Sequence, residues 1–193
     1  TPDVSSAASD VYKRQLEYLN VAGGFFRDTT IHDFDLSRFI LGNDPIIQVS
    51  AFGESLFDEN VKIAKDFDTA MFILKSKSGV LIHINNSRRA VYGYDQRVEV
   101  FGSEGMVISN NQTQNSIERF NKTSTHSKDP IHFFFIERYQ QAYIDQLKSF
   151  IEIIKNNLKP KVTFEDGRKA LIIANAAYES FETKKTVNIN YEN

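Results

Sequence analysis

The sequence predicts an α+β fold: an open, mostly antiparallel β-sheet with helices packed on one face. Two observations carry this prediction. Apolar residues recur at helical spacing towards both ends of the chain, whereas short alternating segments separated by turn residues occupy its middle. Strands and helices do not alternate as they do in a parallel α/β sheet. We therefore expect about five or six strands, in a sheet whose second face is polar or mixed.

The first predicted helix covers about residues 27–41. Phenylalanine and isoleucine recur there at three-to-four spacing, after the backbone-breaking pair Gly23-Gly24. Gly42 stands where such a helix would end. Acidic residues in its first half and Arg38 in its last turn suit the helix dipole.

A run of strands is predicted for the middle of the chain. Serine and glycine residues at 76–79 and 103–105 indicate two hairpins. In the second strand of the first hairpin, Ile82 and Ile84 face one way while His83 faces the other, so one face is expected in the core. The predicted strands are residues 46–52, 69–75, 80–87, 97–102, 106–109 and 116–120.

Two helices and a short strand are predicted for the last third. Apolar residues recur at helical spacing over residues 135–158, and Pro160 closes that helix. Thr163, with Asp166 three residues later, has the form of a capping box, so a second helix is expected to begin there. Residues 186–190 are expected to form the final strand.

Composition bounds the class of protein. The chain has 193 residues, of which 41% are hydrophobic, and this suffices for the core of one domain. Its 23 Lys+Arg residues nearly balance its 25 Asp+Glu residues, so binding to nucleic acid or to a membrane surface is not expected. No apolar run reaches the roughly 18–20 residues that cross a bilayer. Without cysteine, disulfides and thiolate chemistry are excluded, and a cytoplasmic location is expected.

Residues 1–15 differ from the rest of the sequence. They are small and polar, and they lead into no amphipathic pattern. We expect this segment to be a terminal tail or a non-native stretch, and we exclude it from the fold prediction. Residues 16–193 are expected to form one α+β domain.

The densest polar cluster surrounds Asp28 and His32. The two residues are four apart, so on one helix they share a face and their side chains can meet. A carboxylate beside an imidazole fixes the ring's tautomer and stabilises its protonated form, which is what a general base needs. A surface ion pair in the first turn of a helix is the structural alternative. A zinc site that adds Asp33 is weaker, because no second group of ligands stands nearby, and no metal is expected.

A second cluster follows the predicted strand 80–87. Tyr92, Tyr94 and Arg97 stand close together, with a glycine between the two tyrosines. Phenol and guanidinium donors of this kind suit the oxygens of a hydroxyl-rich ligand. The alternative is a polar loop, with Arg97 paired to Glu99 on one face of the following strand.

These segments together resemble the C-terminal domain of the Gfo/Idh/MocA oxidoreductases. Residues 23–39 look like the family's Gly-Gly…Asp-x-x-x-His segment, and residues 137–143 resemble the start of its long C-terminal helix. Residues 92–102 look like the stretch typical of the inositol 2-dehydrogenase branch. The likeness covers about residues 16–191.

The resemblance implies a role for each cluster. His32 would take the proton from a substrate hydroxyl as hydride leaves its carbon for the nicotinamide ring, and Asp28 would orient His32 and bind a neighbouring hydroxyl. Asp33 and Asp35 are expected to be structural. The weaker candidates for the substrate pocket are Thr30, Tyr92, Tyr94 and Arg97.

The resemblance also implies a second half. The family joins this domain to an N-terminal Rossmann domain, which binds NAD or NADP and supplies a catalytic lysine. That domain is absent from this chain, which contains no G-x-G-x-x-G. Residues 16–193 are then the substrate-binding and oligomerisation domain of an NAD(P)-dependent inositol or sugar dehydrogenase, inactive alone and acting on a small polyol.

Assembly follows from the same prediction. An open sheet must cover its second face, so we expect a homodimer or homotetramer through that face. The alternative function is a non-catalytic polyol-binding or assembly module derived from the family.

Overall fold

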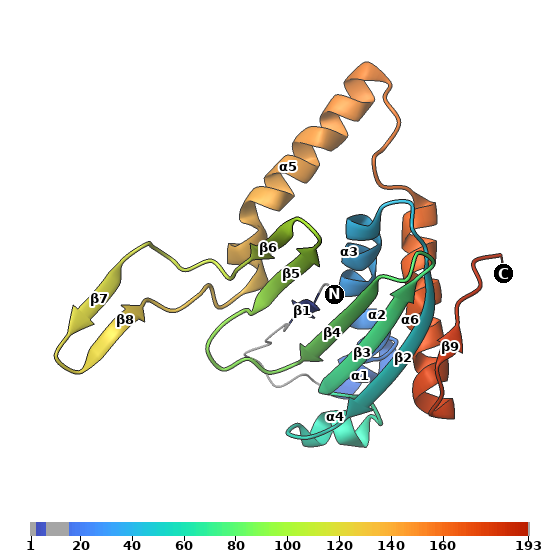
Figure 1. Ribbon diagram of the computed structural model, residues 1–193, viewed down its shortest axis with the longest axis horizontal. Helices are drawn as coiled ribbons and strands as arrows, with labels where there is room; N and C mark the ends of the chain where they lie inside the picture. The colour runs from blue at the N-terminus through green and yellow to red at the C-terminus, as the bar shows by residue number, and fades with distance from the viewer. Residues whose placement is uncertain (1–2, 7–15, 193) are drawn as a thin grey trace.

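The computed structural model describes residues 3–6 and 16–192 (Figure 1). Its helices are α1 (Leu16–Val21), α2 (Phe25–Asp28), α3 (Ile31–Leu41), α4 (Glu59–Ile63), α5 (Phe135–Asn156) and α6 (Phe164–Thr183). Its strands are β1 (Asp3–Ser6), β2 (Ile46–Glu54), β3 (Thr69–Ser76), β4 (Leu81–Ser87), β5 (Gln96–Gly102), β6 (Gly105–Ser109), β7 (Glu118–Asn121), β8 (Ser124–Lys128) and β9 (Val187–Asn188).

Within the described residues the strands form two sheets. The large sheet has seven strands in the order β6-β5-β1-β4-β3-β2-β9, and β7 pairs with β8 in a separate hairpin. Neighbours in the large sheet pair antiparallel, except β1 and β4, which are parallel. The predicted fold class, an open and mostly antiparallel sheet with helices, is confirmed.

The hydrophobic core lies between the large sheet and the helices α2, α3 and α6, which share one of its faces (Figure 1). Phe72 of β3 and Ile82 and Ile84 of β4 are buried at alternate positions, as the period of a strand requires. The ring of Phe26 in α2 meets that of Phe72 edge-on at 4.8 Å. The inward face predicted for residues 80–87 is therefore confirmed.

The N-terminus of α6 forms as predicted. The backbone N–H and the hydroxyl of Thr163 both donate to Asp166, at 2.8 Å each, in a capping box. Arg38 of α3 donates to the same carboxylate at 3.1 Å. The Thr163 N–H and hydroxyl, with Arg38, lower the pKa of Asp166 to about 2. Asp166 therefore caps α6 and also ties it to α3.

The structure corrects the prediction of one helix over residues 27–41. Two helices, α2 and α3, replace it, separated by Thr29 and Thr30. The Thr30 N–H donates to the carbonyl of Phe25 at 3.1 Å, one residue further back than an α-helix reaches. This wider turn changes the direction of the side chains before and after it.

Other differences concern short elements. Neither α1 nor α4 was predicted, because helices this short carry too few residues for a periodic signal. The strand predicted at residues 116–120 begins two residues later, as Glu118–Asn121, and pairs with the unpredicted β8. The hairpin of β7 and β8 projects from the body of the domain instead of extending the large sheet (Figure 1).

Residues 3–6 also depart from the prediction. They form β1, in which Val4 pairs with Ile84 of β4 and with Val98 of β5. The edges of β4 and β5 offer backbone N–H and C=O groups, and an extended segment can pair with them through main-chain hydrogen bonds. Such pairing depends little on the side chains of the segment. Excluding residues 3–6 from the sheet was therefore wrong. Whether residues 1–15 are native stays a prediction, and residues 1–2 and 7–15 lie outside the described residues.

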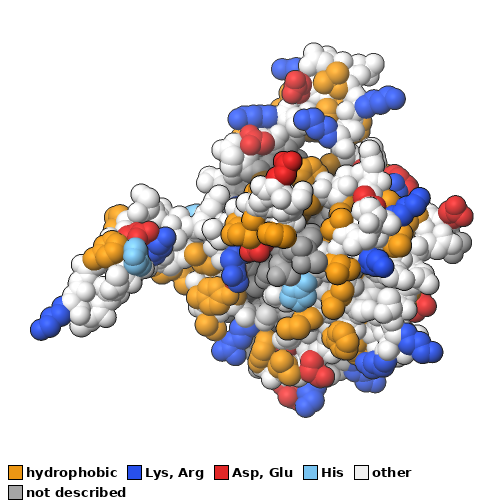
Figure 2. All heavy atoms as spheres, viewed as in Figure 1, with side chains coloured by type: hydrophobic (Ala, Val, Ile, Leu, Met, Phe, Trp, Pro, Cys, Tyr) orange, Lys and Arg blue, Asp and Glu red, His pale blue; other side chains and the backbone are white. Residues whose placement is uncertain are grey.

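The second face of the large sheet is mixed, as predicted. Met71 and Ile73 of β3 and Phe52 of β2 are more than half exposed there, beside the exposed Lys75 and the half-buried His83. Figure 2 shows hydrophobic side chains gathered over the strands on this side, with basic groups around them. None of the described helices covers this face (Figure 1).

Gly24 allows α2 and α6 to pack closely against each other. Its φ of 85° and ψ of 166° are accessible almost only to glycine. A Cβ at this position would lie 2.0 Å from the hydroxyl oxygen of Tyr178, which accepts the N–H of Phe26. The predicted break at Gly23-Gly24 therefore also serves packing.

We expect Gly24→Ala to lower the free energy of unfolding by about 2–4 kcal/mol, because backbone strain adds to the displacement of Tyr178. Urea denaturation measures this loss. Gly42→Ala is the matched control, since φ is 63° there and nothing lies within 4 Å of the added carbon. Equal losses in the two variants would show that the contact with Tyr178 contributes nothing.

Candidate functional site

The turn between α2 and α3 sets the positions of the two predicted catalytic residues. Asp28 ends α2, and His32 lies in the first turn of α3. The wide turn at Thr29 and Thr30 takes them out of the spacing that aligns residues four apart on one helix. In the described part of the chain, no hydrogen bond or ion pair joins Asp28 to His32. The predicted contact between their side chains is therefore not formed.

Asp28 is held by two other side chains. The hydroxyl of Tyr18 in α1 donates to Oδ1 at 2.7 Å, and Nη1 of Arg88 lies 3.5 Å from Oδ2. The Asp28 side chain is 16% exposed. A phenol and a guanidinium thus orient this carboxylate from two sides while one part of it still reaches solvent.

Arg88 belongs to a buried network at the end of β4. Its Nη2 donates to Asp66 at 2.8 Å and its Nε to the carbonyl of Phe67 at 2.9 Å. Asp66 also accepts the N–H of Phe25, whose ring lies 4.8 Å from the guanidinium carbon. Such charge-assisted hydrogen bonds fix geometry strongly. Arg88 therefore joins the sheet to α2 and positions Asp28.

His32 begins one face of α3. Leu36 and Ile40 follow it at intervals of four residues, so all three lie along the same side of the helix. The His32 ring is half-buried, and it makes no hydrogen bond or ion pair with any other residue that the structure describes. Its ring nitrogen is therefore free to take a proton from a ligand.

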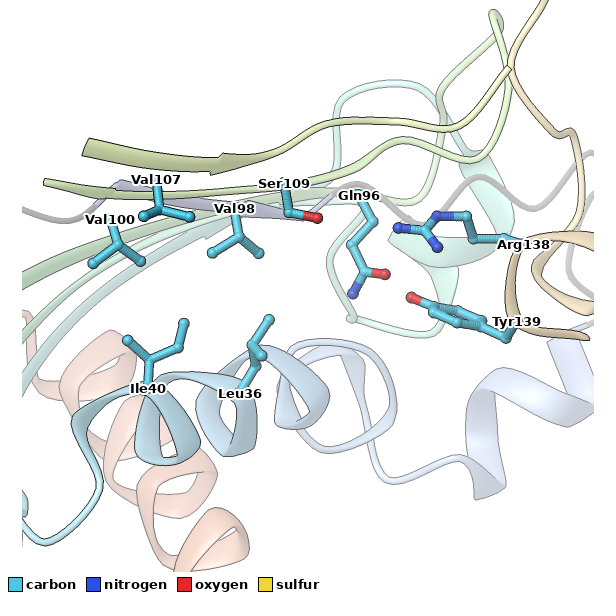
Figure 3. Close-up of a pocket in the computed structure, with 9 residues that line it drawn as sticks. All are labelled: Leu36, Ile40, Gln96, Val98, Val100, Val107, Ser109, Arg138 and Tyr139. Carbon is cyan, nitrogen blue, oxygen red and sulfur yellow. The ribbon is translucent and has the colours of Figure 1, made fainter. Parts of the chain in front are cut away.

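A cleft of about 400 Å³ lies between α3, β5, β6 and the start of α5 (Figure 3). Its volume falls within the roughly 300–1,000 Å³ of small-molecule sites. Its apolar lining consists of Leu36, Ile40, Val98, Val100 and Val107. At the other end, Figure 3 shows Gln96, Arg138 and Tyr139 with their polar atoms turned towards one another. Only this second end offers hydrogen bonds to a polyol.

Tyr94 and Tyr139 form a pair at the polar end. Their rings meet edge-on at 5.8 Å, and a hydrogen bond joins them. Burial raises the pKa of Tyr139, and the charge of nearby Asp33 raises it further. Asp33 follows His32 in α3 and accepts a hydrogen bond from Asn86 at 2.9 Å. Tyr139 therefore lies beside the start of α3 and stays protonated at neutral pH.

Tyr92 and Arg97 lie in a different environment. Both bond to the buried carboxylate of Asp95, which Asn111 also contacts. The hydrogen bond to Asp95 raises the pKa of Tyr92 and that of Arg97. Burial opposes the ionisation of Asp95, but the bonds from Arg97, Tyr92 and Asn111 lower its pKa overall. These side chains hold the loop before β5 together.

Strand alternation explains this division. Gln96 and Val98 of β5 face the helix side of the sheet and line the cleft, whereas Arg97 between them faces the other side. The structure thus places Tyr94 against Tyr139 of the cleft and leaves Arg97 on the open face. Thr30 is fully buried, and its hydroxyl has no hydrogen-bond partner among the described residues.

Sequence reasoning missed four residues of this site. Tyr18 lies in a short helix without a signal, and Gln96 reads as an ordinary strand residue. Arg88 directly follows the predicted strand 80–87, but the next residue, Arg89, gives the same signal. Tyr139 matches the apolar spacing of a long helix and was assigned to its apolar face. Only the tertiary structure brings Tyr18 and Arg88 to Asp28, and Gln96 and Tyr139 to the cleft.

The described residues do not fit a dinucleotide cofactor. Helix N-termini that bind phosphate leave their N–H groups open and carry no acidic residue. Here α3 begins with Asp33 in its first turn, α5 with Glu137, and α6 with a carboxylate-filled capping box. A nicotinamide cofactor at this site would have to be held mainly by residues outside the described chain.

Comparison with known proteins identifies a family. The profile described as the C-terminal alpha/beta domain of an oxidoreductase family, Gfo/Idh/MocA, matches residues 5–189. The myo-inositol 2-dehydrogenase of Thermotoga maritima is 44% identical over 174 residues, which make up 90% of this chain and 52% of that protein. The chain spans about half the length of the curated relatives it matches.

Solved structures agree with this comparison. A probable dehydrogenase from Thermotoga maritima has a TM-score of 0.91 and 41% identity, over 97% of this chain and 56% of that one. A myo-inositol dehydrogenase from Lactobacillus casei, in complex with NAD(H) and myo-inositol, has a TM-score of 0.79 and 25% identity over 98% of this chain and 53% of that one. Among the helices that the structure describes, none is both long and apolar enough to cross a membrane.

Proposed function

This chain belongs to the Gfo/Idh/MocA oxidoreductase family, as its C-terminal α/β domain, and from that premise we propose that it is the substrate-side half of an inositol dehydrogenase. The enzyme would oxidise a ring hydroxyl of inositol or a related polyol to a ketone, with NAD or NADP. One observation carries the proposal. A carboxylate fixed by Tyr18 and Arg88 lies four residues before a histidine whose ring makes no hydrogen bond or ion pair with a described residue.

In the proposed reaction, a side chain of this domain accepts the proton of the substrate hydroxyl. His32 accepts it from the substrate hydroxyl as the carbon that bears this hydroxyl loses hydride and becomes a carbonyl carbon. Asp28 accepts a hydrogen bond from a neighbouring hydroxyl of the substrate and so helps to orient it. The nicotinamide cofactor, when bound, supplies the acceptor for the hydride.

The polar end of the cleft suits the other ring hydroxyls. Tyr139 and Gln96 line this end with hydroxyl and amide groups that both donate and accept hydrogen bonds, and Tyr94 contacts Tyr139. Tyr92 and Arg97 are weaker candidates, because Asp95 already engages both side chains. Thr30 would contact substrate only if the turn that buries it opened.

The cofactor half must be restored to test this proposal. A chimera in which the N-terminal half of the Thermotoga maritima relative precedes Leu16 should reduce NAD⁺ in the presence of myo-inositol. The 193-residue chain alone should not, because its helix N-termini and sequence lack a dinucleotide site. NADH formation by the chain alone would contradict the proposal. A folded chimera that binds inositol without turnover would favour the polyol-binding module instead.

We also propose that copies of the protein assemble through the open face of the large sheet. Met71 and Ile73 are more than half exposed at its centre, and a second copy of the same face is the simplest cover. Light scattering at micromolar concentration should give a dimer or tetramer, and Met71→Glu with Ile73→Glu should give a monomer. Lys77→Glu, in the turn after β3, is the control and should not change the mass. A wild-type monomer would contradict this assembly.

A further inference from the structure

Helix α5 has no buried residue among its 22 positions, although one side of it is strongly apolar. Five of its side chains at helical spacing are between 48% and 64% exposed: Ile136, Tyr143, Leu147, Phe150 and Ile154. An amphipathic helix owes most of its stability to the burial of its apolar face, and isolated helices are marginal in water. These five side chains form an apolar stripe on α5. The stripe therefore requires a partner surface that covers it, which we call its occupant.

The stripe faces away from the body of the domain. Successive residues of a helix are about 100° apart around its axis. The side chains of α5 that are only half exposed are Arg138, Tyr139, Ser149 and Ile153. On the helical wheel these four lie within about 100° of one another, and the centre of the stripe lies roughly 100° further round. Figure 1 shows α5 projecting from the sheet and the other helices along most of its length. The occupant is therefore not part of this described domain.

From these observations we infer that the stripe on α5 is the docking surface for the cofactor-binding half of the enzyme. The chain spans 56% of the solved Thermotoga maritima structure, and 97% of it superposes at a TM-score of 0.91. The remaining part of that longer chain, which has no counterpart among these 193 residues, is the occupant we assign to the stripe. The inference takes the identity of the occupant from the proposed function.

Two features favour a globular domain over a second copy of α5. Ile144 and Ile151 add a row of apolar residues beside the first five, which makes the stripe about 120° wide. A stripe of this width is typical of a helix on a globular core, whereas a two-helix coiled coil uses a narrower seam. The start of α5 also lies at the cleft, since Arg138 and Tyr139 line the cleft. The cofactor-binding half must bring its cofactor to this cleft, so it would also lie against α5.

Hydrogen exchange of residues 143–154 tests the inference, in the chain alone and in the chimera with the Thermotoga maritima N-terminal half. In the chain alone we expect fast exchange at every protein concentration. In the chimera we expect exchange slower by roughly tenfold or more. Protection that rises with the concentration of the chain alone would identify a second copy as the occupant. No protection in the chimera would also overturn the inference.

Substitutions give a second measurement. Leu147→Glu with Ile154→Glu should abolish the protection in the chimera, whereas Lys148→Glu, which changes the net charge equally, should keep it. In the chain alone the double variant should leave the melting temperature unchanged, since both residues already face water. A lower melting temperature there would contradict the inference. A chimera that turns over inositol without protecting α5 contradicts this inference alone, and one that protects α5 without turnover contradicts only the proposed function.

Discussion

Replacing His32 with alanine in the chimera lowers kcat by about 10²–10⁴-fold, the usual loss for a general base. The His32 ring makes no hydrogen bond with any residue that the structure describes, so its nitrogen can accept the proton of a substrate hydroxyl. Because the variant removes a proton acceptor rather than a contact with bound substrate, KM should change much less than kcat. Initial rates of NAD⁺ reduction with myo-inositol, measured from pH 6 to pH 10, check this result.

His126→Ala is the matched control for His32→Ala. His126 lies in β8 on the projecting hairpin, where its ring contacts Glu118 and is largely exposed. Its loss should leave kcat within about twofold of the parent chimera, as expected for a surface residue away from the site. A loss in His32→Ala of less than about tenfold would remove His32 from the role of general base.

Replacing Arg88 with alanine lowers the free energy of unfolding by about 3–5 kcal/mol, because it leaves the buried carboxylate of Asp66 without its cation. Asp66 and Arg88 are both 7% exposed, so water does not readily replace the hydrogen bond that the guanidinium gives to Asp66. Urea denaturation of the 193-residue chain measures the loss. Arg89→Ala, at the next and exposed position, should change stability by no more than about 0.5 kcal/mol.

Arg88→Lys separates the charge from the geometry. A lysine keeps the positive charge beside Asp66 but cannot also donate to the Phe67 carbonyl and approach Asp28 as the guanidinium does. In the chimera we expect most of the stability to return while kcat remains about tenfold low, since Asp28 then loses the guanidinium that helps to orient it. Full recovery of kcat in Arg88→Lys would show that Arg88 does not position Asp28.

Local sequence patterns predicted most of the fold. Alternation at residues 80–87 identified β4 and its buried face. Successive side chains of a strand point to opposite faces, so a buried face appears in the sequence as an apolar residue at every second position. The capping box of Thr163 and Asp166 was also visible, since it needs only two residues three apart. The break within residues 27–41 was not visible, because both halves continue one helical pattern and the turn at Thr30 is set by packing.

The candidate site was predicted in part. The motif resemblance located Asp28 and His32, but the partners of Asp28 were not predicted. Tyr18 lies ten residues before Asp28, and Arg88 lies on a strand far along the chain. No local pattern relates residues at such separations. The cluster at residues 92–97 was predicted as one pocket, and its division follows from the pleat of β5, which sends neighbouring side chains to opposite faces.

The sequence by itself determined the types of the main elements, the hairpins, the cap of α6 and the motif that marks the family. These features depend on residues within a few positions of one another, where backbone geometry and side-chain periodicity act directly. Only the tertiary structure decided which side chains hold Asp28, which residues face the cleft, and that the apolar stripe of α5 points away from its own domain. Those outcomes depend on contacts between distant segments, and the same apolar spacing fits a buried helix and one that awaits its partner.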